Sequence, residues 1–250
     1  MKISLCIPMY NESSIVADTV KTVYAAMEKL SADTGYDYEV LFSNDGSTDD
    51  CADIAKKIVA ELGCGDRIIV TGYEKNRGKG AAVRHAMLES KGDIVVCTDC
   101  DLAYGTDVVG DAVSRFEKSG DKITPDLIIG SRKLGGDGYE GYTLIRKIAS
   151  KVYMIVLRIV AGFRMSDSQC GFKVYTGEAA HRIFGDIITD GFAFDQEVLM
   201  SAQALGMAIS EMPVKIINHR ESKVSVLSDS VKMMRDLLRI KKMVRSRYRR

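Results

Sequence analysis

The stretch Asp93-Ile94-Val95-Val96-Cys97-Thr98-Asp99-Cys100-Asp101 is a short apolar run that ends in two carboxylates one residue apart. An apolar run of this length, rich in β-branched residues, predicts a buried strand over 93–98. Asp99 and Asp101 then follow its carboxyl end, where open α/β sheets bind ligands and where an unpaired buried charge would be very costly. Carboxylate oxygens together with substrate phosphates are the ligands that Mg²⁺ and Mn²⁺ prefer. The pattern therefore favours a metal-assisted phosphate site, although taken alone it also fits a strand followed by a solvated acidic turn.

Strand and helix patterns alternate on the N-terminal side of this stretch. Strands are predicted over 2–8, 38–43 and 67–72, and helices over 12–30, 49–62 and 79–90. This order predicts an α/β fold, in which a doubly wound, mainly parallel sheet carries helices on both faces. Beyond residue 101 we expect a core strand over 127–130, a glycine-rich loop over 135–141 that could act as a lid, and a helix over 142–161.

The composition is that of a globular protein. The 250 residues are 46% hydrophobic and 28% charged, and they are numerous enough to bury a full core. There is no apolar run of about 18 residues, so neither a membrane-spanning helix nor a secretory segment is predicted. The 6 cysteines are expected to be free thiols in a reducing compartment. Cys97 and Cys100 also form a C-x-x-C spacing, but no second such pair completes a zinc site, and redox chemistry would place the motif at a helix start after the first strand.

The charge of the chain is distributed unevenly. Residues 231–250 hold nine basic residues and one acid, so they carry +8, and because the whole chain carries +1 the rest carries −7. Apolar residues recur among those charges at helical spacing, which predicts a basic amphipathic helix over 226–250 behind a main domain over 1–225. Such a helix either binds a membrane surface or packs on its own domain with its basic face in solvent. Nucleic acid is disfavoured as a partner because the tail offers only Tyr248 for stacking.

Polar or charged residues follow four successive predicted strands. Tyr10 and Glu12 follow the first, Asp45 the second, and the basic, glycine-rich segment 75–80 the third, at a helix N-terminus that favours anions. With the two aspartates after the fourth strand, they predict one crevice with places for a nucleotide, a metal and phosphates. A nicotinamide-dependent oxidoreductase is disfavoured, since no G-x-G-x-x-G follows the first strand.

Seven motifs between residues 3 and 225 occur in an order known from one family: IPMYNE, SNDGSTD, KNRGKGAAVRHAM, DCDL, GSR, SDSQCGFKVYT and GFAFDQEVL. On these motifs the chain resembles the family-2 inverting glycosyltransferases of the GT-A fold, in the branch that glycosylates polyprenyl phosphates. It is most similar to the dolichyl-phosphate glucosyltransferases and next to the dolichyl-phosphate mannose synthases. SDSQCGFK followed by FAFDQE is the narrower signal and favours the lipid-phosphate branch.

The resemblance implies a role for each matching residue. The residues around the nucleotide would be Pro8, Tyr10, Glu12, Ser43 and Asp45. Those at the diphosphate and metal would be Asp99, Cys100 and Asp101, with Asp101 as the more direct metal ligand. Contacts with phosphate would come from Arg132, Arg220 and Lys223. Two residues depart from the usual pattern: Asn44 stands where an aspartate is usual, and Cys100 where an alanine is frequent.

The implied reaction is the inverting transfer of a sugar, glucose from UDP-glucose being favoured, to a polyprenyl or dolichyl phosphate with the help of Mg²⁺ or Mn²⁺. We expect a cytoplasmic protein that binds the inner face of the membrane through its basic helix, alone or with a membrane-protein partner. A phosphate acceptor is already anionic and needs no strong base.

Transfer to a saccharide hydroxyl, as in cell-wall or capsule assembly, would need a base. Asp195 is then the first candidate for the catalytic base and Glu197 the second, while Asp167 could instead hold the acceptor loop in shape. A non-catalytic module that binds nucleotide-sugars is a third alternative.

Overall fold

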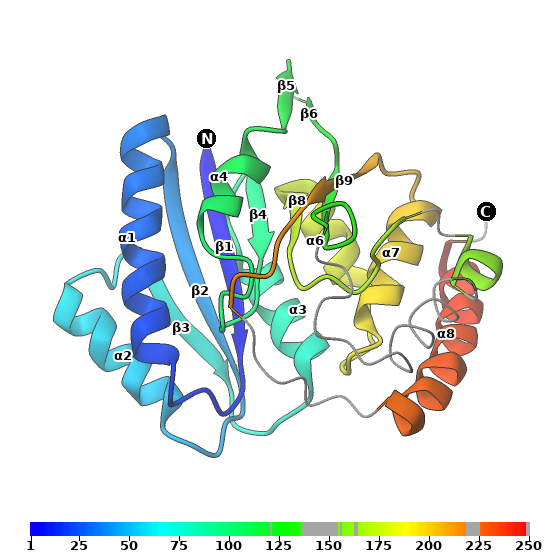
Figure 1. Cartoon of the computed structure of the whole chain (residues 1–250), viewed down its shortest axis with the longest axis horizontal. Coiled ribbons are helices and arrows are strands. Elements are labelled where there is room, and N and C mark those ends of the chain that lie inside the picture. Colours follow the sequence, from blue (N-terminus) through cyan, green and yellow to red (C-terminus); the bar gives the residue numbers. More distant parts are fainter. Residues whose placement is uncertain (121, 137–154, 156, 163–164, 219–225, 249–250) are drawn as a thin grey trace.

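The structure, a computed structural model, describes residues 1–120, 122–136, 155, 157–162, 165–218 and 226–248. At its centre lies a seven-stranded sheet with the order β3-β2-β1-β4-β8-β7-β9 (Figure 1). The strands are β1 (Lys2–Met9), β2 (Asp37–Asp45), β3 (Ile68–Tyr73), β4 (Ile94–Cys97), β7 (Leu127–Ser131), β8 (Lys173–Thr176) and β9 (Ile209–Pro213). All neighbours pair in parallel except β8, which is antiparallel to both β4 and β7. The predicted mainly parallel sheet is confirmed.

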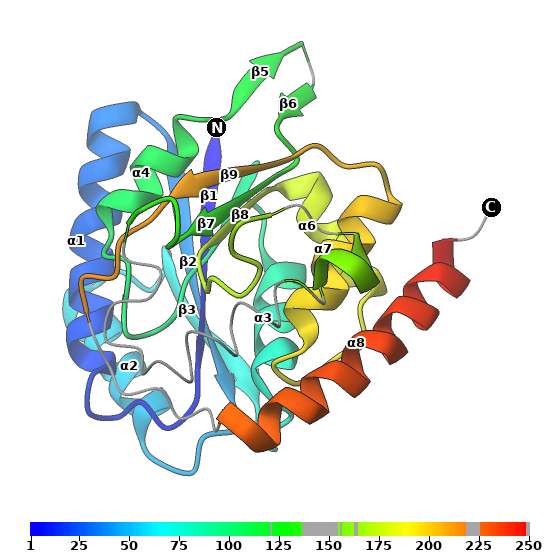
Figure 2. The same cartoon turned by 45° about the vertical axis from the view of Figure 1, so that its right-hand side comes forward.

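Helices cover both faces of the sheet, as predicted (Figures 1 and 2). One hydrophobic cluster joins the sheet to α1 (Val16–Thr34), α2 (Cys51–Leu62) and the short α4 (Asp107–Val113). A second cluster joins it to α3 (Lys79–Glu89), α6 (Gly177–Asp186), α7 (Phe194–Ala204) and α8 (Val226–Tyr248). A small hairpin of β5 (Glu117–Ser119) and β6 (Lys122–Thr124) projects from the edge.

The strand β4 shows why this sheet is buried on both sides. Ile94 and Val96 enter the cluster with α1 and α2, whereas Val95 and Cys97 enter the cluster on the other face. Successive side chains of a strand point to opposite faces, so a strand covered on both sides must be apolar throughout. Thr98, the first polar residue after this run, is still buried, and the half-buried Asp99 follows it.

Two predicted boundaries differ from the structure at the start of helices. The helix expected over 12–30 begins at Val16, because residues 11–15 form a turn in which the Glu12 carbonyl accepts from the Val16 amide at 2.9 Å. The helix expected over 49–62 begins at Cys51, whose amide donates to the Asp49 carboxylate at 3.2 Å. Of the helix expected over 142–161, residues 155 and 157–161 are described and helical. The remainder of that helix, and residues 137–141 of the predicted lid loop, lie outside the described residues.

The basic C-terminal helix packs on the main body of the protein. Leu237, Ile240 and Val244 of α8 are buried in the cluster that contains α7. The Arg247 guanidinium donates to the buried Glu197 carboxylate of α7 at 2.9 Å. Packing on its own domain is thus the arrangement that the structure has, while the division into domains at residue 225 stays a prediction. Within the described chain, every helix is too short or too polar to cross a membrane.

Candidate active site

The loops after β1 and β2 bind each other beside the carboxyl end of the sheet. The Asn11 side chain accepts from the Thr48 amide at 2.8 Å, and the Asn11 amide donates to Ser47 Oγ at 3.0 Å. Asn44 Oδ1 accepts from both the amide and the hydroxyl of Ser47, at 3.1 and 2.6 Å. An aspartate would supply the same acceptor oxygen, so the departure at Asn44 leaves the loop intact.

The predicted nucleotide residues lie along this edge. Pro8 and Ser43 are buried neighbours on β1 and β2, Glu12 is half-buried in the following turn, and the Tyr10 ring is exposed at the rim. The Ser43 hydroxyl is buried without a hydrogen-bond partner in the described part of the chain. The structure thus brings together an aromatic ring and polar groups where we predicted a nucleotide; the contacts themselves stay predictions.

Asp45 organises the loop between β3 and α3. Its carboxylate accepts from the Tyr73 hydroxyl at 2.6 Å, from the Arg77 amide at 3.0 Å and from the Gly78 amide at 2.9 Å. The Asn76 side chain donates to the same carboxylate at 2.9 Å. These four donors match the four acceptor positions of a carboxylate. In the structure Asp45 therefore holds the basic, glycine-rich loop in place, and the base or sugar contact that we predicted for it stays a prediction.

Asp99 forms an ion pair with the first residue of α3. Lys79 Nζ lies 2.5 Å from Asp99 Oδ1. Burial raises the pKa of Asp99, but Lys79, Lys173 and Arg132 together lower it by more, with Lys79 contributing most. The other oxygen, Oδ2, lies over Gly171, where any Cβ would overlap it. A side chain in place of Gly171, the glycine of the QCGF motif, would therefore displace this carboxylate from its present position.

The two residues after Asp99 face in different directions. The Cys100 thiol belongs to the hydrophobic cluster with α1, and burial raises its pKa to about 12. Cys100 is thus placed at the site only through its backbone, whose carbonyl accepts from Thr19 Oγ1 at 2.8 Å. The half-buried Asp101 carboxylate accepts from the Ala103 amide at 3.1 Å. All of the cysteines are free and buried, so the C-x-x-C spacing forms no disulfide.

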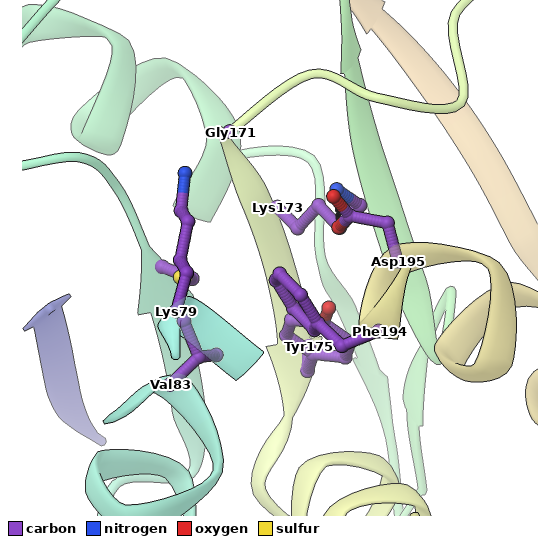
Figure 3. A pocket seen from close by; sticks show the side chains of 8 residues that line it. Lys79, Val83, Gly171, Lys173, Tyr175, Phe194 and Asp195 are labelled. Atoms are coloured by element: carbon purple, nitrogen blue, oxygen red, sulfur yellow. Dashed lines mark hydrogen bonds and ion pairs between the residues drawn. The ribbon is translucent and has the colours of Figure 1, made fainter. Parts of the chain in front are cut away.

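Asp195 and Lys173 form a second ion pair across a small cavity from Lys79 (Figure 3). Lys173 Nζ lies 2.6 Å from Asp195 Oδ1 and also donates to the Cys170 carbonyl at 2.6 Å. The Lys173 side chain is 3% exposed and that of Asp195 is 14% exposed. Burial lowers the pKa of Lys173, but Asp195 raises it by more, so the ammonium stays charged. The predicted catalytic base is therefore neutralised by a buried cation.

Arg132 and Asp167 form a third pair. Arg132 Nε and Nη2 donate to the two oxygens of the Asp167 carboxylate at 2.7 and 2.9 Å. Burial raises the pKa of Asp167, but the hydrogen bonds and the charge of Arg132, together with the Gln169 amide, lower it by more in sum. The expectation that Asp167 shapes a loop agrees with this geometry, since Asp167 fixes the guanidinium in a bidentate bond.

Glu197 is excluded as a base by its position. Its side chain is fully buried, and it accepts from the Ile188 and Thr189 amides at 3.2 and 2.9 Å as well as from Arg247. The segment that follows Ile188 and Thr189 packs on the first turn of α3, where the Asp190 carbonyl accepts from the Ala81 amide at 3.2 Å. Glu197 is therefore a structural anchor between α7, α8 and the glycine-rich loop.

Sequence reasoning missed the roles of Lys79 and Lys173. Lys79 was placed in a predicted anion-binding loop, but its pairing with Asp99 was not predicted. Lys173 begins the buried run of β8, where an unpaired ammonium would be costly, and that was the signal for a carboxylate partner. Arg220 and Lys223, the other predicted phosphate contacts, lie outside the described residues.

The site fits a divalent cation that is held jointly with a substrate. Asp99 and Asp101 are hard oxygen donors at the end of β4, and Gly171 leaves the space that Asp99 needs. Among the described residues no group of three or more histidine, cysteine and carboxylate side chains could hold a metal ion. Phosphate oxygens would therefore have to complete the coordination, as is usual for Mg²⁺.

Comparisons with known proteins agree with this geometry. Residues 4–184 match the model of the glycosyl transferase family 2. The chain is 31% identical over 248 residues to a dolichyl-phosphate beta-glucosyltransferase of Dictyostelium discoideum, which covers 96% of this chain and 73% of that protein. It is 29% identical over 247 residues to the human dolichyl-phosphate beta-glucosyltransferase, covering 96% of this chain and 75% of that protein.

The fold is also that of solved structures. Glucosyl-3-phosphoglycerate synthase from Mycobacterium tuberculosis, crystallised with Mn²⁺, uridine diphosphate and phosphoglyceric acid, superposes with a TM-score of 0.64. The identity is 19%, and the alignment covers 99% of this chain and 78% of that one, so this likeness shows the fold alone. The family match over most of the chain and the relatives at about 30% identity lead to one conclusion: the chain belongs to glycosyl transferase family 2.

Proposed function

We propose that this glycosyltransferase transfers glucose from UDP-glucose to a polyprenyl phosphate such as dolichyl phosphate, with inversion at the anomeric carbon. The names of the relatives support the sugar and the acceptor, because dolichyl-phosphate beta-glucosyltransferases are similar to the chain over almost its whole length. The observation that carries the choice of acceptor is the ion pair between Asp195 and Lys173.

This pair bears on the acceptor through the need for a base. A hydroxyl acceptor must lose a proton as it attacks, so it needs a carboxylate that is free to take that proton. Asp195 Oδ1 is held 2.6 Å from the buried Lys173 ammonium, so this oxygen is already engaged and is not free to bind an acceptor hydroxyl. A phosphate acceptor brings its own negative charge and needs only positioning and charge screening. The arrangement therefore favours a phosphate.

The donor would lie along the carboxyl ends of β1, β2 and β4. Tyr10 would stack on the base, with Pro8, Glu12 and Ser43 beside the nucleoside and Asp45 holding the loop that follows β3. Asp101 and Asp99 would hold Mg²⁺ or Mn²⁺ together with the diphosphate. Such a cation neutralises the charge that develops on the leaving diphosphate. A structural neighbour that was crystallised with Mn²⁺ and uridine diphosphate supports divalent metal use in this fold.

The acceptor phosphate would be bound by cations at the same edge. Arg132 is kept in a fixed orientation by Asp167 and retains N–H groups beyond the two that this pair uses. Arg220 and Lys223, which follow Asn218 in the chain, are the other proposed phosphate contacts.

A lipid-linked acceptor requires the protein to work at a membrane surface. The exposed basic residues of α8 support binding at the inner, cytoplasmic face: Arg235, Arg239, Lys242 and Arg245. Because the apolar residues Leu237, Ile240 and Val244 are buried in the protein, this attraction would be electrostatic. A membrane-protein partner would add to it.

The test is transfer of radiolabelled sugar to a short polyprenyl phosphate, with UDP-glucose and GDP-mannose in parallel, Mg²⁺ or Mn²⁺, and an EDTA control. We expect metal-dependent label in the lipid phase from UDP-glucose. Label from GDP-mannose alone would contradict the proposed donor. Label that appears only when a saccharide replaces the lipid would contradict the acceptor and favour transfer to a hydroxyl.

A further inference from the structure

The ammonium of Lys79 contacts one of the two oxygens that Asp99 could offer to a metal. It contacts Asp99 Oδ1 at 2.5 Å, while the second oxygen of Asp99 lies in the space left by Gly171. The side chains of Lys79 and Asp99 are only 28% and 29% exposed, so solvent screens their attraction less than at the surface. Asp99 is therefore already neutralised in the structure.

The two other cations near Asp99 are already bound to other groups, so Lys79 is its direct ion-pair partner. The Arg132 guanidinium is bound to both oxygens of Asp167, and the Lys173 ammonium is bound to Asp195 and to the Cys170 carbonyl. Both cations act on Asp99 only at longer range. A divalent cation that binds this oxygen alone must therefore displace Lys79 and leave its ammonium half-buried, with only the longer-range attraction of Asp195, which is already paired with Lys173.

A nucleoside diphosphate changes this balance. Lys79 is the first residue of α3, and a helix N-terminus attracts phosphate. The preceding loop is held in position by Asp45, which accepts from the Gly78 amide, and by the ion pair of Arg77 with Asp190. Phosphate oxygens at this place would accept hydrogen bonds from the Lys79 ammonium after it leaves Asp99. The diphosphate would thus free Asp99 for the metal, and the metal would free Lys79 for the diphosphate.

We propose that Lys79 is a displaceable counter-ion that passes from Asp99 to the diphosphate when the metal and the nucleotide bind. It suppresses metal binding to the free enzyme and couples metal affinity to nucleotide affinity, and that coupling is reciprocal. The inference rests on the proposed use of a nucleoside diphosphate and a divalent cation, and it does not depend on the identity of the sugar or the acceptor.

The test is a titration of the full chain with Mn²⁺, with and without uridine diphosphate, in which free Mn²⁺ is read by electron paramagnetic resonance. We expect Lys79→Met to bind Mn²⁺ about tenfold more tightly than the wild type when no nucleotide is present, which corresponds to about 1.4 kcal/mol. The gain in Mn²⁺ affinity that uridine diphosphate produces should be smaller in this variant. Lys79→Arg keeps the charge and should retain the wild-type coupling.

Two further variants serve as matched controls. Lys56→Met removes an exposed lysine of α2 and should leave Mn²⁺ affinity unchanged. In an Asp99→Asn background, Lys79→Met should no longer tighten Mn²⁺ binding, because the pair that it breaks is already absent. Circular dichroism checks that each variant is folded, and Lys79→Gln replaces Lys79→Met if that variant is not.

Equal Mn²⁺ affinity of the wild type and the Lys79 variants without nucleotide would overturn the inference. The same holds if uridine diphosphate leaves the Mn²⁺ affinity of the wild type unchanged. Glucosyl transfer is measured on the same preparations to separate this outcome from failure of the proposed function. If Lys79→Met binds Mn²⁺ more tightly than the wild type but the wild type transfers no glucose, the proposed function alone is contradicted. If the wild type transfers glucose but Lys79→Met has the same Mn²⁺ affinity as the wild type, the role of Lys79 alone is contradicted.

Discussion

At the scale of residues, the site is built from three ion pairs whose cations are all partly or fully buried. They are Lys79 with Asp99, Lys173 with Asp195 and Arg132 with Asp167. Each carboxylate was singled out from the sequence, whereas none of the three cations was predicted as its partner: Arg132 was predicted only as a phosphate contact, and the pairing of the two lysines was not predicted. A carboxylate at a strand end is visible as an interruption of an apolar run, but its partner comes from a distant segment.

Replacement of Lys173 by methionine should destabilise the protein strongly. Asp195 is largely buried and would lose its cation. Breaking a buried ion pair lowers the free energy of unfolding by about 3–5 kcal/mol. Urea unfolding monitored by circular dichroism measures this loss. Arg182→Met, which breaks an exposed pair with Asp186, should cost less than about 1 kcal/mol. Equal losses of stability in the two variants would show that the buried pair stabilises the fold no more than the exposed one.

The pair of Arg132 and Asp167 should make stability depend on acid pH. The pKa of Asp167 is lowered in the folded protein, so the pair contributes in full above the ordinary pKa of about 3.9 and is lost as the pH falls through the folded value. Asp167→Asn should therefore be less stable than the wild type at neutral pH.

The difference between the two proteins should narrow as the pH approaches about 3. Free energies of unfolding from urea titrations between about pH 3 and pH 7 measure it. Asp53→Asn, at a carboxylate that is exposed on α2, is the control and should follow the wild type. A difference for Asp167→Asn that stays constant with pH would contradict the assignment.

At the scale of elements, α8 combines two functions that the sequence left as alternatives. Its apolar stripe completes the core beside α7, and its opposite face presents basic side chains to solvent. Arg247 is a basic residue of α8 with a structural role, since its guanidinium neutralises the buried Glu197 of α7. Glu197 in turn holds the segment before α7. Removal of the helix would uncover the core and leave Glu197 without this cation, so truncation is a poor test of membrane binding.

Replacement of Arg239, Lys242 and Arg245 by glutamine is a sharper test. Each basic residue near an anionic bilayer contributes about 1 kcal/mol, so the triple variant should bind anionic vesicles about a hundredfold more weakly while the fold is retained. Sedimentation with vesicles of anionic or neutral lipid measures this. The same change at Lys29, Lys56 and Lys57, exposed on α1 and α2, should have little effect. Unaltered binding by the α8 variant would contradict the proposed docking face.

At the scale of the whole molecule, the site joins both halves of the sheet. Asp45, Lys79 and Asp99 come from the parallel half, and Lys173 and Asp195 follow from the half that contains the antiparallel β8. A ligand that bridges these groups would stabilise the entire fold, since it binds the native state alone.

Uridine diphosphate with Mn²⁺ should therefore raise the free energy of unfolding by about 2.7 kcal/mol when the free nucleotide is present at a hundred times its dissociation constant. Thermal unfolding measures the increase, and EDTA should remove most of it. Asp101→Ala should lose the increment even with Mn²⁺ present. An increase that survives EDTA unchanged would contradict a shared metal site.

The first half of the fold was predictable because its signals are local. Strands and helices up to β4 alternate in clear apolar periods, and only their ends shifted by a few residues. The strand β8 was not predicted, since it has four residues and begins with a lysine. Its place between β4 and β7 is set by pairing between segments far apart in the chain. The helices α4, α6 and α7 and the strand β9 were likewise not predicted.

The α/β order, the family and the carboxylates at the strand ends can be read from the amino-acid sequence, because periodicity and motif spacing are properties of neighbouring residues. Which cation neutralises which carboxylate depends on how distant segments pack. Lys173 and Asp195 are 22 residues apart, Arg132 and Asp167 are 35 apart, and Arg247 and Glu197 are 50 apart. Such pairs form where the packing of strands and helices excludes water from both charges, and local sequence patterns do not predict which two residues will pair.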